Sequence, residues 1–275
     1  MNNHSRNLIA SEFRNCVNNT IERISGEATH RPFHTALLSE DAIFWSRFER
    51  SFSTSFGQRV IEKIASVVAL SNGATGVERQ KTTYIDIDDA YIAGLKQINI
   101  IHGKGTGVLR DGIKGYIAAI NAHIEAIRAG FQKTHDWNST ITLLRATPLS
   151  GHTSRIRVIS DMWWKKEGTD NYISLKTVKP NIDQTAVAKK DCLHLTIDNP
   201  RCNVYFGLPY NPYGENKFDY AFNPPMGIFD FRNDPVVLIG KEMWDTIGGD
   251  GCYEEILEIA REVGRETRQT IVNIR

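Results

Sequence analysis

One stretch in the middle of the chain constrains the fold more than any other, because it predicts two adjacent antiparallel strands. Residues 162–165 and 172–178 are rich in strand-forming side chains, and the turn-forming segment 167–171 separates them. This pattern is typical of a β-hairpin. Asp161 opens the first strand, and Lys176 is expected well inside the second. A lysine in an otherwise apolar strand is costly to desolvate unless a carboxylate or an anion compensates its charge, so the two residues indicate a functional site.

Size and composition allow a conventional folded core. The chain has 275 residues, of which 41% are hydrophobic, enough for one large domain or two small ones. No apolar run approaches the roughly 18 residues that cross a bilayer, and residues 1–12 are polar, so a cytoplasmic location is expected. The cysteines stand far apart without a CxxC pair, which predicts buried or incidental thiols at Cys16, Cys192, Cys202 and Cys252.

Charge is nearly balanced over the whole chain but not along it. The formal net charge is +1, whereas residues 145–205 carry 10 basic and 6 acidic groups, an excess of four positive charges. This excess surrounds the predicted hairpin, as expected if the region meets an anionic partner.

The order of predicted elements favours an α/β fold organised as one domain over residues 1–275. A helical part is expected over 1–135, a catalytic sheet core over 139–210, and loops and helices over 211–275. Strands are predicted at 140–144, at 155–159, in the hairpin and at 203–208, with a helix from Ile182 before the last of these. The first strands would form an antiparallel meander within a mixed sheet, packed against helices.

The helices have recognisable start and periodicity signals. Ser39 is an N-cap candidate for an amphipathic helix, which the segment 51–58 is expected to interrupt before helical spacing resumes over 59–70. Glu62 lies in the resumed helix beside its apolar face, where it is either a flanking carboxylate or an active-site residue. Further helices are predicted at about 11–24, 241–247 and 253–270.

Phosphodiester hydrolysis needs a hard divalent cation, a nucleophilic water and a positive charge near the phosphate. Asp161 and Lys176 can provide for the first and the last of these. Asp161 can hold a hard divalent cation, and Lys176 can stabilise the charge that develops on the phosphate. The spacing resembles the PD-(D/E)XK nuclease motif, in which an acid precedes an acid-x-lysine triplet on the next strand. Here the motif reads Ser160-Asp161, then Ser174-Leu175-Lys176.

The chain departs from that motif at two positions of unequal weight. Ser160 replaces proline with little chemical consequence, whereas Ser174 replaces the second acid with a neutral and poorer magnesium ligand. In the superfamily a glutamate from a preceding helix often joins the site. Glu62 is therefore the first candidate and Glu125 the second, while Asp170 and Asp183 are less well placed.

Longer phrases resemble one family in particular. Residues 48–58 are similar to the helix-loop-helix entry of several restriction endonucleases. Residues 173–181, 188–191, 208–214 and 238–245 together are similar to the TdeIII family of type II restriction endonucleases. The resemblance covers about residues 40–265. It implies a restriction-endonuclease-like mixed β-sheet core flanked by α-helices, and Mg²⁺-dependent cleavage of double-stranded DNA at a short palindromic or interrupted palindromic site. GGNCC is the family's typical target, and a homodimer would match such a two-fold symmetric site.

The same resemblance implies DNA contacts near the cut. The candidates are phosphate-binding or base-reading side chains that could equally be solvated surface groups, namely Lys179, Asn181, Lys189 and Lys190. Tyr210 and Asn211 either read bases or order a turn. Catalysis would rest on Asp161, Ser174, Lys176 and Glu62, with Asp161 and Glu62 holding the metal.

Three other functions remain open at this stage. One is a repair or recombination nuclease without sequence specificity, and another is a DNA-binding relative that has lost catalysis through Ser174. The third is a structural protein in which Lys176 only pairs with a neighbouring acid. In every case Trp163 and Trp164 should point to opposite sheet faces, with at least one in the core.

Overall fold

The computed structural model describes residues 1–26, 30–93, 136–222 and 228–272. It divides into two compact units, the first formed by residues 1–77 with 244–275 and the second by residues 78–243. The predicted single-domain organisation stays a prediction. Among the described residues no helix combines the length and the hydropathy needed to cross a membrane.

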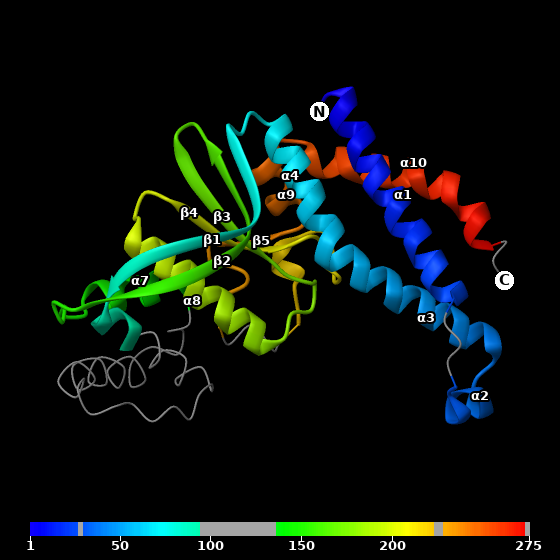
Figure 1. Cartoon of the computed structure of the whole chain (residues 1–275), viewed down its shortest axis with the longest axis horizontal. Coiled ribbons are helices and arrows are strands. Elements are labelled where there is room, and N and C mark those ends of the chain that lie inside the picture. The colour runs from blue at the N-terminus through cyan, green and yellow to red at the C-terminus, as the bar shows by residue number, and fades with distance from the viewer. Residues whose placement is uncertain (27–29, 94–135, 223–227, 273–275) are drawn as a thin grey trace. The chain divides into compact units, whose positions relative to one another are not determined.

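The first unit is helical. Its helices are α1 (Asn3–Gly26), α2 (Pro32–Leu37), α3 (Glu40–Ser55), the π-helical turn η1 (Phe56–Val60), α4 (Ile61–Ser71) and α10 (Cys252–Val272) (Figure 1). Helix α1 packs against α3, α4 and α10. Apolar side chains fill these contacts, and ion pairs flank them, as between Arg6 and Glu255 at 2.9 Å. The helices predicted near the two chain ends are confirmed, with α1 longer than expected.

The predicted interruption at 51–58 is wrong, because the helix continues through it. Ser39 caps α3 as predicted, accepting a hydrogen bond from the Ala42 backbone N–H at 3.2 Å. Instead of a loop, the chain then passes through the wider turn η1 directly into α4. Stacked rings support this path, since the Phe56 ring lies 5.4 Å from Phe52 and 6.1 Å from Phe13. Side-chain packing thus outweighs the weak helix propensity of a serine- and threonine-rich segment.

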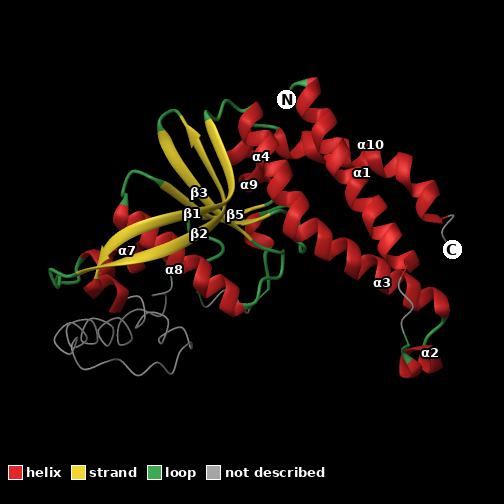
Figure 2. Ribbon diagram, viewed as in Figure 1, coloured by secondary structure: helices red, strands yellow, loops and turns green. Residues whose placement is uncertain are grey.

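The second unit is built on a five-stranded sheet in the order β1-β2-β3-β4-β5 (Figure 2). The strands are β1 (Gly76–Asp88), β2 (Thr153–Lys166), β3 (Thr169–Leu175), β4 (Asn203–Leu208) and β5 (Val237–Ile239). The remaining elements are α7 (Trp137–Arg145), α8 (Ile182–Asp198) and the short turn η3 (Lys217–Asp219). Helix α9 (Lys241–Gly248) follows β5 and contains the point at which the chain leaves this unit.

The hairpin is confirmed, and the sheet around it is mixed as predicted. Strands β2 and β3 are antiparallel, with Met162 opposite Ile173, and positive-φ residues Glu167 and Gly168 form the turn. Strand β4 is parallel to both β3 and β5, and α8, the helix predicted before the strand at 203–208, makes the crossover from β3 to β4. The predicted meander is wrong in part, because 155–159 and 162–165 belong to one continuous strand, β2. Trp164 is 2% exposed whereas Trp163 is half-buried, as expected for opposite faces.

The strand predicted at 140–144 is wrong, because these residues belong to α7. Their β-branched side chains favour a strand, but the carboxylate of Asp136 caps a helix by accepting the Ser139 N–H at 2.9 Å. Asp234 accepts the Trp137 N–H at 2.7 Å. The buried side chains on α7 then recur at helical spacing, at Trp137, Ile141 and Leu144.

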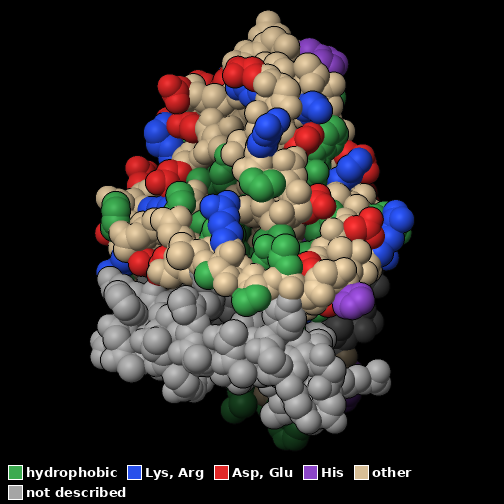
Figure 3. Space-filling model, turned by 90° about the vertical axis from the view of Figure 1, so that its left-hand side faces the viewer, with side chains coloured by type: hydrophobic (Ala, Val, Ile, Leu, Met, Phe, Trp, Pro, Cys, Tyr) green, Lys and Arg blue, Asp and Glu red, His purple; other side chains and the backbone are tan. Residues whose placement is uncertain are grey.

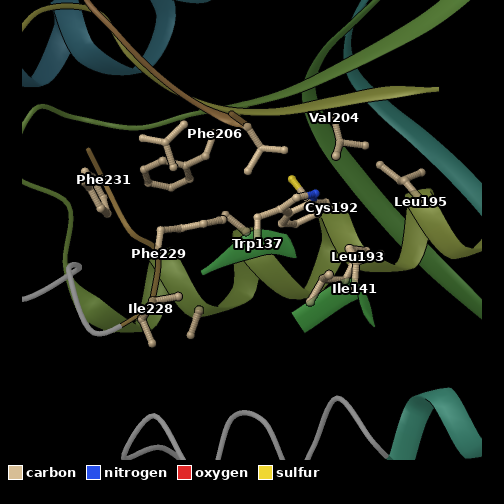
Figure 4. Close-up of a cluster of buried hydrophobic side chains, with 14 of the residues drawn as sticks. Trp137, Ile141, Cys192, Leu193, Leu195, Val204, Phe206, Ile228, Phe229 and Phe231 are labelled. Atoms are coloured by element: carbon tan, nitrogen blue, oxygen red, sulfur yellow. The ribbon is translucent and has the colours of Figure 1, made fainter. Parts of the chain in front are cut away.

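One hydrophobic core joins α7 and α8 to the sheet (Figure 4). Phe206 of β4 lies against Phe229 and Phe231, with ring centroids 5.1 and 5.7 Å away. The same cluster includes Cys192 and Leu193 of α8. Helix α8 therefore covers the sheet face to which Phe206 points. All four cysteines are free and buried, as predicted.

Candidate active site

The carboxylate of Asp161 is the centre of a compact polar cluster at the end of the hairpin. Its Oδ2 atom accepts three hydrogen bonds, from Ser174 Oγ at 3.2 Å, the Leu175 backbone N–H at 2.8 Å and Lys176 Nζ at 2.8 Å. The pairing of Met162 with Ile173 places Asp161 beside Ser174 on the neighbouring strand. The register of the hairpin therefore brings together the three residues predicted from the motif.

Lys176 lies just past the end of β3, not well inside a strand as predicted. Its backbone N–H still donates to Gly207 O at 3.0 Å, which holds the residue against β4. The side chains of Lys176 and Asp161 are 21% and 20% exposed. An ion pair in this position is partly shielded from solvent yet open to a ligand, a placement in which charged groups are often functional.

Gln80 contacts the other oxygen of the same carboxylate. Its Nε2 atom donates to Asp161 Oδ1 at 3.3 Å, and its backbone has φ 52°, which is unusual for a residue other than glycine. Gln80 was not predicted from the sequence, because a glutamine within a strand does not indicate a positive φ. The observed outlier indicates that β1 is shaped locally where it meets the cluster.

Asp191 is a second carboxylate near this cluster, which sequence reasoning also missed. Burial raises the pKa of its carboxyl to about 6, the positive charges of Lys190 and Lys176 oppose that rise, and the negative charge of Asp161 adds to it. Asp191 thus interacts electrostatically with both members of the ion pair. The sequence feature that could have identified Asp191 is an acid beside the apolar positions 188 and 192, on the helix that follows Lys176.

The oxygen atoms near Asp161 suit a hard cation, although the described residues contain no group of three or more histidine, cysteine or acidic side chains that could hold a metal. Asp161 and Asp191 are carboxylates and Ser174 offers a hydroxyl. Magnesium binds such oxygen ligands and keeps several waters, so it does not require an all-protein cage. The donor chemistry therefore fits Mg²⁺.

The sequence-predicted metal ligand Glu62 lies in the first turn of α4, half-buried. It belongs to the first unit and Asp161 to the second, so its predicted role stays a prediction. Glu125 lies outside the described residues. Asp170 accepts the indole N–H of Trp163 at 3.1 Å, and Asp183 is in the first turn of α8.

Lys189 is the clearest correction among the predicted DNA contacts, because it is not at the surface. It is 2% exposed, and its Nζ donates to the Ile228 carbonyl at 2.6 Å. Burial lowers the pKa of its ammonium to about 8, against the opposite effect of Asp234. Its charged group is directed to the interior and cannot reach a phosphate in this conformation.

Of the other predicted contacts, Lys179, Tyr210 and Asn211 lie on loops, Asn181 lies at the start of α8, and Lys190 lies within α8. Asn181 caps α8 by accepting the Gln184 N–H, and Asn211 orders its own turn by bonding the backbone of Tyr213 and Asn216. Exposed groups are Lys179, whose Nζ lies 5.5 Å from the Tyr213 ring centroid, and Tyr210. Lys190 is half-buried. Basic and acidic side chains are interspersed on the face drawn in Figure 3.

The mixed sheet flanked by helices, with an acid on one strand and a lysine just after the next, defines a fold of the restriction-endonuclease-like class. Comparison with known proteins makes the class narrower. The sequence pattern of the family described as "Type II restriction endonuclease, HinfI" matches residues 1–264, almost the whole chain. The chain belongs to this family.

Individual relatives agree with the family. The type II restriction enzymes HgiCII and HgiEI of Herpetosiphon aurantiacus are each 26% identical to the chain over 253 residues, covering 90% of it and 82% of each relative. The enzyme HgiBI of the same organism is 25% identical over 246 residues, covering 88% of the chain and 80% of the relative. No solved structure matches significantly. The comparisons support a nuclease of a restriction-modification system.

Proposed function

We propose that this chain is a site-specific endonuclease that hydrolyses double-stranded DNA with Mg²⁺. The observation that carries the proposal is the Asp161–Lys176 contact of 2.8 Å at the hairpin end, in a chain that belongs to a restriction endonuclease family. A carboxylate and an ammonium held side by side are two of the groups that phosphodiester hydrolysis uses.

Asp161, with a second carboxylate, would hold the metal, and Glu62 is the sequence-predicted partner. A bound Mg²⁺ supplies positive charge that polarises the scissile phosphate. Lys176 places its ammonium where charge develops on the phosphate or the attacking water. Ser174 occupies the position of the missing acid and donates a hydrogen bond that holds the Asp161 carboxylate in place.

The finer features follow the resemblance to the TdeIII family. They are a short palindromic or interrupted palindromic target, GGNCC in particular, and a homodimer that matches its symmetry. Exposed Lys179, Asn181 and Tyr210 are the candidates for DNA contacts, together with the half-buried Lys190 and Asn211. A cytoplasmic location would fit such an enzyme.

A second candidate function is a DNA-binding relative without catalysis, because Ser174 removes a carboxylate from the motif. Such a protein would shift DNA in a gel and leave it intact across magnesium and manganese titrations. A repair or recombination nuclease would cut DNA without discrete bands.

Digestion of phage DNA of known sequence by the purified chain with Mg²⁺ tests the proposal, with the fragment ends sequenced. The proposal expects reproducible bands whose ends share one short symmetric sequence. A smear, or intact DNA that is nevertheless shifted, would favour one of the alternatives.

A further inference from the structure

Helix α8 lies over the same sheet face as Ser174. Ser174 is the Cα partner of Phe206 on the parallel strand β4, so the two side chains point to one face. Phe206 belongs to the core that includes Cys192 and Leu193 of α8. The Cys192 thiol also approaches the Tyr205 carbonyl oxygen of β4 at 3.8 Å, which fixes this turn of the helix against the sheet.

Asp191 immediately precedes Cys192 and lies at the edge of this packed face. Its side chain is 23% exposed, close to the values of Asp161 and Lys176, so it is neither a solvated surface group nor a core group. The neighbouring Lys190 Nζ lies 4.0 Å from its Oδ1. The electrostatic interaction of Asp191 with Lys176 and Asp161 agrees with a place on the same side of the cluster.

Ser174 cannot supply the second negatively charged ligand that the motif normally contains. Its hydroxyl is neutral, and it donates to Asp161 Oδ2 at 3.2 Å. A site with one carboxylate would bind Mg²⁺ weakly, because ligand charge contributes strongly to the affinity for a hard cation. The cluster therefore needs a second carboxylate that can approach Asp161 on the Ser174 face.

We propose that Asp191 is this second metal-binding carboxylate, supplied by α8 in place of the acid absent at Ser174. The inference rests on the proposed function. Asp161, Ser174, Lys176 and Asp191 all belong to the second unit, so the site needs no ligand from outside it. This assignment replaces Glu62, the carboxylate predicted from the sequence, as the partner of Asp161.

Binding of Mn²⁺ alone, measured on the full chain by the loss of the free-ion electron paramagnetic resonance signal, tests this without using catalysis. The variants are Asp191→Asn, Asp161→Asn, Glu62→Gln and the exchange variant Ser174→Asp/Asp191→Asn. Asp198→Asn is the matched control, an acid on the same helix whose neighbour is Asp86. We expect Asp191→Asn and Asp161→Asn to weaken Mn²⁺ binding about tenfold or more, because each removes a charged ligand. Asp198→Asn should bind as the unmodified chain does, whereas weaker Mn²⁺ binding by Glu62→Gln with unchanged binding by Asp191→Asn would support the ligand predicted from the sequence and overturn the inference.

The exchange variant separates loss of a ligand from loss of the fold. A carboxylate restored at position 174 should recover most of the Mn²⁺ affinity that Asp191→Asn loses, even if the single variant unfolds more easily on heating. Unchanged Mn²⁺ binding by Asp191→Asn would overturn the inference, as would failure of a folded exchange variant to recover binding.

DNA cleavage by the same proteins distinguishes this inference from the proposed function. If Asp161→Asn loses both Mn²⁺ binding and cleavage while Asp191→Asn keeps both, Asp191 is not the ligand and the nuclease assignment stands. If Asp191→Asn loses Mn²⁺ binding but the unmodified chain cuts no DNA, the metal site stands and the nuclease assignment fails.

Discussion

Lys176 Nζ lies 2.8 Å from Asp161 Oδ2, and the hairpin register together with the Lys176 N–H bond to Gly207 O of β4 accounts for this contact between residues fifteen positions apart. The Leu175 N–H and the Ser174 hydroxyl donate hydrogen bonds to the same oxygen, so one carboxylate atom contacts both residues at the end of β3. The two opposite charges compensate each other in a partly shielded place. A metal ion at Asp161 and a phosphate at Lys176 would each replace one half of this ion pair.

Replacing Lys176 should remove catalysis and leave the fold intact. For Lys176→Ala we expect the cleavage rate to fall about 10²–10³-fold, the usual effect of losing one group that stabilises transition-state charge. Lys165→Ala is the control, since Lys165 lies on the same hairpin and pairs with Asp170 at 3.7 Å. Rates of plasmid linearisation measure both, and equal rates for the two variants would contradict the role of Lys176.

Asp136 should stabilise α7 through its cap. Asp136→Ala is expected to lower the free energy of unfolding by about 1 kcal/mol, because the Ser139 N–H loses its acceptor. Asp136→Asn should cost much less, since asparagine caps nearly as well. Urea denaturation followed by circular dichroism gives both values. An equal loss in the two variants would mean that charge, not capping, is responsible.

Lys189 should make stability depend on pH in the alkaline range. Burial lowers the pKa of this ammonium from 10.5 to about 8, so between these values the unfolded chain binds more protons than the folded one. The free energy of unfolding should therefore rise with pH through this window, relative to Lys189→Met, at up to about 1.4 kcal/mol per pH unit. Below pH 8 the cost of the buried charge is present in full.

The measurement is urea unfolding at several pH values on both sides of that window. Lys190→Met is the control, because Lys190 is adjacent but half-buried and should keep the slope of the unmodified chain. A slope in Lys189→Met equal to that of the unmodified chain would show that Lys189 is not the group responsible.

Two substitutions of Gln80 should separate the energetic cost of its positive φ from the loss of its hydrogen bond to Asp161. Gln80→Gly and Gln80→Val both lose the amide that binds Asp161, but only glycine adopts φ 52° without strain. We expect Gln80→Val to be less stable than Gln80→Gly by about 1–3 kcal/mol. Thermal unfolding of the two proteins gives this difference, and equal stability would mean that the left-handed conformation carries no cost.

Elements whose formation depends on neighbouring residues in the sequence were predictable from those residues. The hairpin followed from two strand-forming runs and a turn, and Ser39 marked the start of α3. Asp161 and Lys176 were predictable as a site because the hairpin that joins them is itself local. The spacing of the motif was enough to predict that they lie in one site.

Features that depend on distant packing were not predictable in the same way. The β-branched run 140–144 became a helix because Asp136 caps it and Asp234 binds its first turn. Lys189 is buried where the Ile228 carbonyl, thirty-nine positions away, accepts a hydrogen bond from its ammonium. Asp191 interacts electrostatically with Asp161 because α8 packs on the sheet.

The measurement that tests the central claim most directly is the rate at which purified Asp161→Asn cuts DNA with Mg²⁺, compared with the unmodified chain at equal concentration. The substitution keeps the size of the side chain and removes the charge that the proposed metal and Lys176 both need. We predict that the unmodified chain produces discrete fragments and that Asp161→Asn, with an unchanged circular dichroism spectrum, produces none. Fragments formed by Asp161→Asn at the unmodified rate would contradict the assignment of this hairpin as the active site.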